Sequence, residues 1–258
     1  MEPDDWWAPH ARFIYVDRNG VLTFKSELRD LTNEEELLYN RIVLAADVTV
    51  IFNSELYRIS ACDIKTMLVV NGREKGMLND ECINAYMKIL QQRANNMGAK
   101  IWFMNSNFYG FLKTEGYDKV SRWTKNVDIF DKDKIVFPIH FEDKKHWTLG
   151  IINMRDRRFE YYDSLSGLDE EYSQTMSFYI QMEAMNKEKK FDILKWNKTK
   201  VNGRYLPLQN NGIDCGVFVC QYAECFSRDV WPTFSPKDMP VFRRRMVVEL
   251  ATGKLLPP

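Results

Sequence analysis

A chain of 258 residues in which 45% are hydrophobic can bury one sizeable core or two small ones. Its 36 basic residues balance its 36 acidic residues, and this net charge of zero argues against wholesale nucleic-acid binding, leaving only local charged patches. The acidic start MEPDDWWAPHARFIY lacks the apolar segment of a signal peptide, and no apolar run approaches the roughly 18 residues that span a bilayer.

The chain has five cysteines, and none of their spacings forms the paired CxxC pattern of a zinc site. An odd number without such pairs favours a reducing compartment, with most of the thiols free and buried in the core. We therefore expect no metal site. The cysteines are Cys62, Cys82, Cys215, Cys220 and Cys225.

The N-terminal part of the chain divides into an extension and the start of a domain. Residues 1–30 mix charged, aromatic and polar side chains without periodicity, and we interpret them as an N-terminal extension. A domain over residues 31–258 follows. Its first helix is expected over residues 33–44, because Thr32 and Glu35 have the spacing of a capping box.

Two further helices are framed by clear start and stop signals. The first lies between Asn79, a good N-cap residue, and Gly98, a good stop, with apolar residues at i, i+3, i+4 and i+7 between them. The last helix of the chain is framed by Ser235 as N-cap, Pro236 in its first turn and Gly253 past its end.

Segments rich in β-branched and aromatic residues indicate strands between these helices. We expect strands at 134–141, 147–154, 157–163 and 191–196, and further helices at 170–187 and 214–229. Helices flank this compact run of strands, and no repeats or linkers interrupt it. The pattern predicts a single α+β domain with a central, mostly antiparallel sheet flanked by helices.

The stretch LQNNGIDCGVFVC, residues 208–220, places a turn and an acid directly before a cysteine that begins a helix. A thiolate is the reactive form of cysteine, and both the positive end of a helix and a neighbouring histidine favour it. Gly216 leaves the backbone beside the sulfur unobstructed. Cys215 therefore suits a nucleophile, although the position alone also fits a small residue buried at a helix start.

Only three histidines can supply a base. His10 lies in the extension and His140 inside a strand, whereas His146 begins a strand after the polar loop EDKK. In a simple hairpin that turns at residues 154–155, His146 lies directly opposite Asp163, close enough for a side-chain hydrogen bond. Asp163 would then orient the imidazole as in a catalytic triad. One bulge would break this register, and a surface ion pair remains the alternative.

Acyl transfer also needs a group that stabilises negative charge on the carbonyl oxygen. Gln209 lies six residues before Cys215, on the other side of the turn. Its side-chain amide is placed to act beside the Cys215 backbone N–H, although a glutamine near a turn is by itself a weak signal.

The chain resembles the SUMO-specific cysteine proteases, the ubiquitin-like-protein protease family of the papain-like clan, in three short motifs: QNNGIDCGVFVC, HW and YYDS. Longer blocks resemble the family in the family's order: LNDECINAYM, NFYGFLKTEGYDKVSRWTKNVDIFDKDKIVFPIHF and YAECFSRD…MPVFRRRMVVELATGKLL. The resemblance covers roughly residues 31–256 and implies a papain-like cysteine protease fold. By this resemblance the family's triad falls on His146, Asp163 and Cys215, and its oxyanion-hole glutamine on Gln209.

The resemblance also implies how a substrate is selected. The family threads the C-terminal Gly-Gly of its modifier through a narrow tunnel roofed by tryptophans, which only glycines can pass. Trp147 matches one roof residue, but Met77 stands where the family usually has the other, just before LND. Methionine is flexible and makes a poorer rigid lid, so we expect slower turnover or looser selectivity.

Two charged residues match positions at which the family contacts the surface of the modifier. These are Asp80 and Arg122, each of which also fits an ordinary role, as a helix-start acid and a solvated arginine. Trp123 is expected to pack in the core. The basic clusters at 155–158 and 243–245 are interpreted as solvated faces rather than sites.

The function that the resemblance implies is a thiol protease that cleaves after the C-terminal Gly-Gly of SUMO, without a metal or cofactor. It would mature SUMO precursors and release SUMO from target lysines, as a monomer in the nucleus or at the nuclear envelope, with the cytoplasm as a further setting. Two alternatives stay open. The chain would act on another ubiquitin-like modifier or an acetyl donor, or it would be a catalytically weak SUMO-binding module, for which Met77 is the clue.

Overall fold

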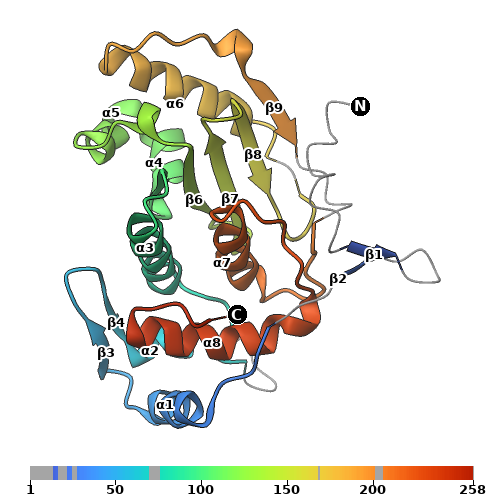
Figure 1. The fold of residues 1–258 in the computed structure, drawn as a ribbon. Coiled ribbons are helices and arrows are strands. Elements are labelled where there is room, and N and C mark those ends of the chain that lie inside the picture. The colour runs from blue at the N-terminus through green and yellow to red at the C-terminus, as the bar shows by residue number, and fades with distance from the viewer. Residues whose placement is uncertain are drawn as a thin grey trace.

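The computed structural model describes residues 14–16, 22–24, 28–69, 76–167, 169–200 and 206–257. Most of the predicted N-terminal extension, with His10, lies outside the described residues; the part described includes a two-stranded hairpin of β1 and β2. The remainder consists of helices around a sheet, which confirms the predicted α+β class (Figure 1).

Groups of helices and groups of strands follow one another along the described chain. The helices are α1 (Asn33–Leu44), α2 (Ala61–Lys65), α3 (Asp80–Asn96), α4 (Asn107–Glu115), α5 (Tyr117–Val120), α6 (Tyr172–Asn186), α7 (Cys215–Phe226) and α8 (Met239–Thr252), with 3₁₀ turns η2 (Ser121–Thr124), η3 (Ile129–Asp131), η4 (Ile193–Lys195) and η6 (Pro236–Asp238). The strands are β1 (Ile14–Val16), β2 (Leu22–Phe24), β3 (Val50–Asn53), β4 (Arg58–Ser60), β5 (Ile101–Phe103), β6 (Lys134–Phe141), β7 (His146–Asn153), β8 (Arg158–Tyr162) and β9 (Asn197–Lys200).

The main sheet has five strands in the order β5-β6-β7-β8-β9. Its two central pairings, β6 with β7 and β7 with β8, are antiparallel and join eight and five residue pairs. The outer pairings, of β5 and β9 with their neighbours, are parallel and join only three and four. The sheet is therefore mixed, with the antiparallel part dominant as predicted.

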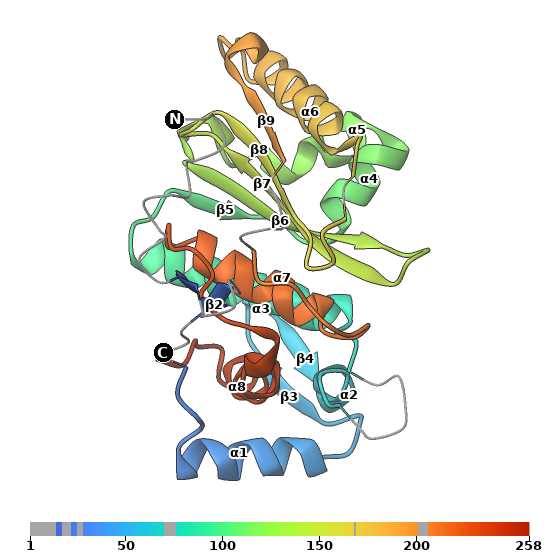
Figure 2. The same cartoon turned by 90° about the vertical axis from the view of Figure 1, so that its right-hand side faces the viewer.

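Helices cover both faces of this sheet. Because successive side chains of a strand point to opposite faces, Val136 packs toward α3 and α7, whereas its neighbours Ile135 and Phe137 pack toward α4 and α6. Helices α8 and α1 and the β3–β4 hairpin lie beyond α3 and α7 (Figure 2). Within the described residues, no helix combines the length and the apolar character needed to cross a bilayer.

Among the described helices, α7 is the most enclosed. Every one of its residues except Glu224 is buried, as its sequence CGVFVCQYAECF predicts for a helix that is apolar on nearly all sides. It packs against β7 on one side and against α3 and α8 on the other. The position of its N-terminus is thereby fixed relative to the sheet.

The predicted helix signals operate as expected. Thr32 and Glu35 form a capping box at the start of α1. Asn79 accepts a first-turn backbone N–H of α3, and Gly98 follows the end of that helix with φ +66°. Ser235 forms its capping box with the 3₁₀ turn η6, from which α8 continues.

The strand expected at 191–196 is wrong. The Asp192 side chain accepts the Leu194 backbone N–H, and this local bond closes the 3₁₀ turn η4 in place of an extended ladder. The strand β9 begins only after this turn, at Asn197.

The predicted register of the β7–β8 hairpin is wrong by two residues. Asn153 pairs with Arg158, because the turn takes four residues instead of two, and the ladder continues to Leu149 opposite Tyr162. Continuing this register places Asp163 opposite Thr148, so that it lies diagonally across from His146 rather than directly opposite it. An even shift leaves every side chain on its predicted face.

The interpretation of residues 243–245 as a solvated face is also wrong. Arg243 and Arg245 are only 5% and 4% exposed, because their side chains satisfy buried carboxylate and carbonyl groups. The cluster at 155–158 is exposed as predicted except at the half-buried Arg158.

A glycine in β7 gives a test of the packing under the sheet. A Cβ atom on Gly150 would lie 2.4 Å from the ring of Phe137 and 3.0 Å from that of Tyr172. We expect Gly150→Ala to lower the free energy of unfolding by about 1–3 kcal/mol through overpacking. Gly110 of α4 has open space around it, so Gly110→Ala is the matched control and should stabilise by about 0.5–1 kcal/mol. Urea denaturation compares the two, and equal stabilities would contradict this packing.

Candidate active site

Cys215 is the first residue of α7 and is 1% exposed. The Phe218 N–H bonds to the Asp214 carbonyl and closes the first turn, so the N–H groups of residues 215–217 have no partner within the helix. These groups and the helix dipole place positive potential at the sulfur, which favours a thiolate.

His146 and Asp163 meet beside this cysteine. The imidazole Nε2 donates to Asp163 Oδ1 at 2.7 Å, and both side chains are buried. The diagonal placement keeps them on the same face of the sheet, within reach of each other. The other ring nitrogen is available for Cys215, with which His146 also interacts. The structure therefore brings together the three residues that sequence reasoning selected.

The Asp163 carboxylate is held by the loop that follows β8. Its Oδ1 accepts the Leu165 backbone N–H at 2.8 Å. Its Oδ2 lies only 2.4 Å from the place where a Cβ atom on Gly167 would sit. Any larger residue at 167 would displace the carboxylate from His146, a constraint that no sequence signal indicated.

The charge on His146 is stabilised by its partners. Burial lowers the pKa of the imidazole, but the hydrogen bonds with Asp163 and Cys215 and the attraction of their charges outweigh it, raising the pKa of His146 from 6.5 to about 9. At neutral pH the imidazolium form therefore predominates. This arrangement supports a thiolate–imidazolium pair.

Gln209 is fixed by the residue that follows the acid. Ser164 donates its hydroxyl to Gln209 Oε1 at 2.5 Å and accepts the Gln209 backbone N–H at its carbonyl at 2.9 Å. The Gln209 Nε2 donates to the Asn211 carbonyl at 2.6 Å, which fixes which end of the amide carries the nitrogen. Within the described residues, this is the one hydrogen bond that the Gln209 Nε2 donates. Sequence reasoning missed Ser164, although it belongs to the YYDS motif.

Leu78 contacts both the first turn of α7 and Trp147, the residue that follows His146. The Trp147 indole donates to the Leu78 carbonyl at 3.1 Å. A Cβ atom on Gly216 would lie 2.9 Å from the Leu78 Cβ, so only glycine admits this close approach. The segment that carries Met77, which is half-buried, is thereby held between α7 and Trp147.

Trp147 is itself fixed on a second side. The His140 ring stacks on it, with centroids 4.2 Å apart and an interplanar angle of 27°. Burial lowers the pKa of His140 below 6.5, so this ring is neutral at pH 7 and has a pKa unlike that of His146. The stacking and the Leu78 bond together hold the indole rigid.

The two residues expected to contact a modifier are both exposed. Asp80 is the first residue of α3, and Arg122 lies in η2. Their exposure leaves their proposed role open to test. Trp123, next to Arg122, packs on Phe108 and Phe111, as predicted for a core residue.

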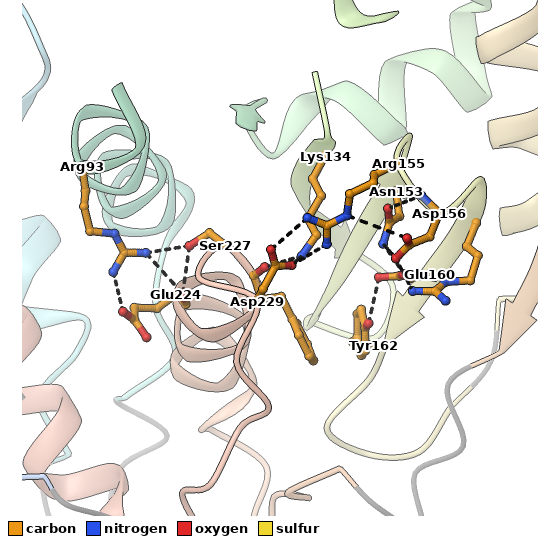
Figure 3. Close-up of polar contacts among 12 residues, drawn as sticks. Arg93, Lys134, Asn153, Arg155, Asp156, Glu160, Tyr162, Glu224, Ser227 and Asp229 are labelled. Carbon is orange, nitrogen blue, oxygen red and sulfur yellow. Dashed lines mark hydrogen bonds and ion pairs between the residues drawn. The ribbon is translucent and has the colours of Figure 1, made fainter. Parts of the chain in front are cut away.

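A cavity of about 470 Å³ lies at the opposite end of α7. It is lined by charged residues that pair with one another: Lys134 and Arg155 bind Asp229, and Arg158 binds Glu160 (Figure 3). Twelve residues at 1.5 Å per residue put it roughly 17 Å along the helix from Cys215. We interpret this network as an anchor between the sheet and the end of α7.

A family model described as "Ulp1 protease family, C-terminal catalytic domain" matches residues 76–253. Sentrin-specific protease 2 from Rattus norvegicus is 36% identical over 201 residues, which cover 77% of this chain and 33% of that protein. A putative ubiquitin-like-specific protease 1B from Arabidopsis thaliana is 34% identical over 259 residues, covering 92% of this chain and 74% of that protein. The chain spans about a third of the length of the first of these relatives.

The fold has solved counterparts. The C-terminal Ulp1 protease domain, solved in complex with Smt3, the yeast ortholog of SUMO, superposes with a TM-score of 0.72 at 27% identity, covering 89% of this chain and 99% of that one. The likeness agrees with the predicted papain-like α+β architecture.

The His146 titration tests the electrostatics of the site without any substrate. We expect NMR to find a histidine that titrates near pH 9, and Asp163→Asn to move it downward, since the lost carboxylate stabilised the imidazolium. His140 should titrate below 6.5 in both proteins and is the internal control. Because the folded-state pKa is raised, the stability that the pair contributes should be complete below pH 6.5 and lost as pH rises through 9. A His146 pKa near 6.5 would contradict the geometry.

Proposed function

The chain belongs to the Ulp1 protease family, and we propose that it is a cysteine protease that cleaves after the C-terminal Gly-Gly of SUMO. Its substrates would be SUMO precursors, cleaved at a peptide bond, and SUMO-conjugated proteins, cleaved at an isopeptide bond to lysine. The observation that carries the proposal is the His146–Asp163 pair beside Cys215 at the N-terminus of α7. All three residues lie inside the segment that matches the family.

In the proposed first step, the Cys215 thiolate attacks the carbonyl carbon of the last glycine. The oxyanion that forms accepts hydrogen bonds from the uncapped N–H of Cys215 and from the second N–H of the Gln209 amide. The carbon–nitrogen bond then breaks, and the His146 imidazolium gives its proton to the leaving amine. The product is a thioester between SUMO and Cys215.

In the second step, His146 takes a proton from water, and the resulting hydroxide attacks the thioester. The carbon–sulfur bond breaks, SUMO leaves with a free carboxyl group that loses its proton to solvent, and the thiolate is restored beside the protonated His146. Asp163 holds the imidazole in one orientation throughout and stabilises its charged form.

Selection for glycine would come from the segment of Met77 and Leu78, which is held between α7 and Trp147. Trp147 is fixed by Leu78 and His140, so it offers a rigid surface under which only residues without a Cβ would pass. Met77 would close the tunnel from the other wall with a flexible side chain. Asp80 and Arg122, both exposed, are our candidates for contacts with the modifier's surface.

Loss of the thiol tests the proposed chemistry. We expect Cys215→Ala to abolish cleavage of a SUMO precursor, a loss of at least about 10⁴-fold, because no other group supplies the nucleophile. Cys62→Ala is the matched control, since Cys62 is exposed and should not affect the rate. Cleavage is followed by gel shift with SUMO, ubiquitin and neddylation-modifier precursors. Cleavage of another modifier alone would keep the mechanism and overturn the substrate, whereas SUMO binding without turnover would favour a binding module.

Met77 is the residue at which selectivity should be adjustable. We expect Met77→Trp to raise kcat/KM for a Gly-Gly substrate roughly threefold to tenfold, about 1 kcal/mol, because a rigid ring holds the extended glycines better. The same change should slow cleavage of an Ala-Gly substrate, which needs a wider gap. Met182→Trp is the control for an added aromatic ring. Met182 is a partly buried methionine of α6, on the face of the sheet opposite α7. Equal effects on both substrates would refute a roof role for Met77.

A further inference from the structure

The acid before the nucleophile stands at the N-cap of α7 but does not act as a cap. An aspartate in this position normally accepts an N–H from the second or third residue of its helix. Within the described residues, the Asp214 carboxylate accepts no bond from the first turn of α7. The N–H groups that an N-cap aspartate usually satisfies are therefore left open beside Cys215.

The carboxylate is instead drawn to an arginine of α8. Asp214 Oδ1 accepts Arg243 Nε at 3.0 Å and Nη2 at 2.6 Å, and Oδ2 accepts the Asn211 side-chain amide at 2.6 Å. Asp214 and Arg243 are 4% and 5% exposed, so solvent screens this pair little. The carboxylate's orientation is fixed by these three bonds.

The same guanidinium also binds two backbone carbonyls, one in the turn before Cys215 and one just after α2. Arg243 Nη2 also donates to the Ile213 carbonyl at 2.9 Å, and Nη1 donates to the Met67 carbonyl at 2.8 Å. One buried arginine thus contacts both the turn before Cys215 and Met67, which follows α2.

The charge balance at the thiol depends on this arrangement. The charged groups around Cys215 are His146, which interacts with it and is paired with Asp163, and its chain neighbour Asp214, which is paired with Arg243 of α8. A free carboxylate one residue from the sulfur would repel a thiolate and would compete with the substrate oxyanion for the open N–H groups. Arg243 neutralises Asp214 and turns it away from both.

We propose that Arg243 is a positioning residue that keeps the N-terminus of α7 uncapped and available to the Cys215 thiolate and the reaction oxyanion. The inference rests on the proposed cysteine-protease function, but its first readout does not require a substrate. If Arg243 had a purely structural role, its loss would only lower the stability of the fold. In the proposed role, its loss also lowers the reactivity of Cys215, and this reactivity returns when the Asp214 carboxylate is removed as well.

The experiment compares four variants of the full chain with the wild type. Arg243→Met removes the charge, and Arg243→Met/Asp214→Ala removes the carboxylate that it shields. Arg243→Lys keeps the charge and is the conservative variant, and Arg243→Gln takes the place of Arg243→Met if that variant does not fold. Arg245→Met is the matched control, because Arg245 is equally buried in α8 but binds the Arg29, Leu256 and Pro257 carbonyls, away from the nucleophile.

The first readout is the rate of iodoacetamide alkylation of Cys215 between pH 5 and 9, mapped by mass spectrometry. We expect Arg243→Met to react roughly tenfold more slowly at pH 6.5 and its midpoint to rise by about one pH unit. The alkylation rate of the double variant at pH 6.5 should return to within about threefold of the wild-type rate. Arg243→Lys and Arg245→Met should keep the wild-type midpoint even where urea denaturation shows lower stability.

The second readout is kcat for SUMO-precursor cleavage, which should follow the same order if the proposed function also holds. Failure of SUMO cleavage in the wild type, with the alkylation pattern intact, would overturn the substrate and leave the role of Arg243 standing. Equal alkylation defects in Arg243→Met and Arg245→Met would overturn the inference. So would a double variant no faster than Arg243→Met alone.

Discussion

Helix α7 has little freedom to move, because every residue except Glu224 is buried between the sheet and the helices α3 and α8. The thiol at its first residue is therefore as fixed as the core itself. The far end is anchored too: Arg93 binds Glu224, and Lys134 donates to the Phe226 carbonyl (Figure 3). The sheet then needs only to place His146 correctly, and the long β6–β7 ladder does so.

Single residues in the loops serve two parts of the site at once. Ser164 follows Asp163 and binds Gln209, so the carboxylate beside His146 and the Gln209 amide are connected through one residue. Leu78 packs on Gly216 beside the thiol and accepts the Trp147 indole. Displacement of either loop would therefore misplace two groups of the site together.

The sequence predicted correctly those features that depend on residues close together in the chain, such as the helix starts. Thr32 and Asn79 cap their helices within three residues, so their effect is visible in the sequence, and the family motifs pointed to the residues that we propose as catalytic. The register of the β7–β8 hairpin was wrong by two residues, yet the partnership of His146 with Asp163 survived because the side-chain period of a strand is two. Arg243 could not be predicted, because its burial depends on Asp214, 29 residues away in the chain.

The most direct test of the account is a covalent trap at Cys215. SUMO, ubiquitin and the neddylation modifier, each ending in a thiol-reactive glycine-vinyl group, are incubated with the purified chain, and the adduct is mapped by mass spectrometry. We expect an adduct with SUMO on Cys215 and little with the other two. SUMO bound without an adduct, or an adduct on Cys62 instead, would contradict the assignment of the nucleophile at the start of α7.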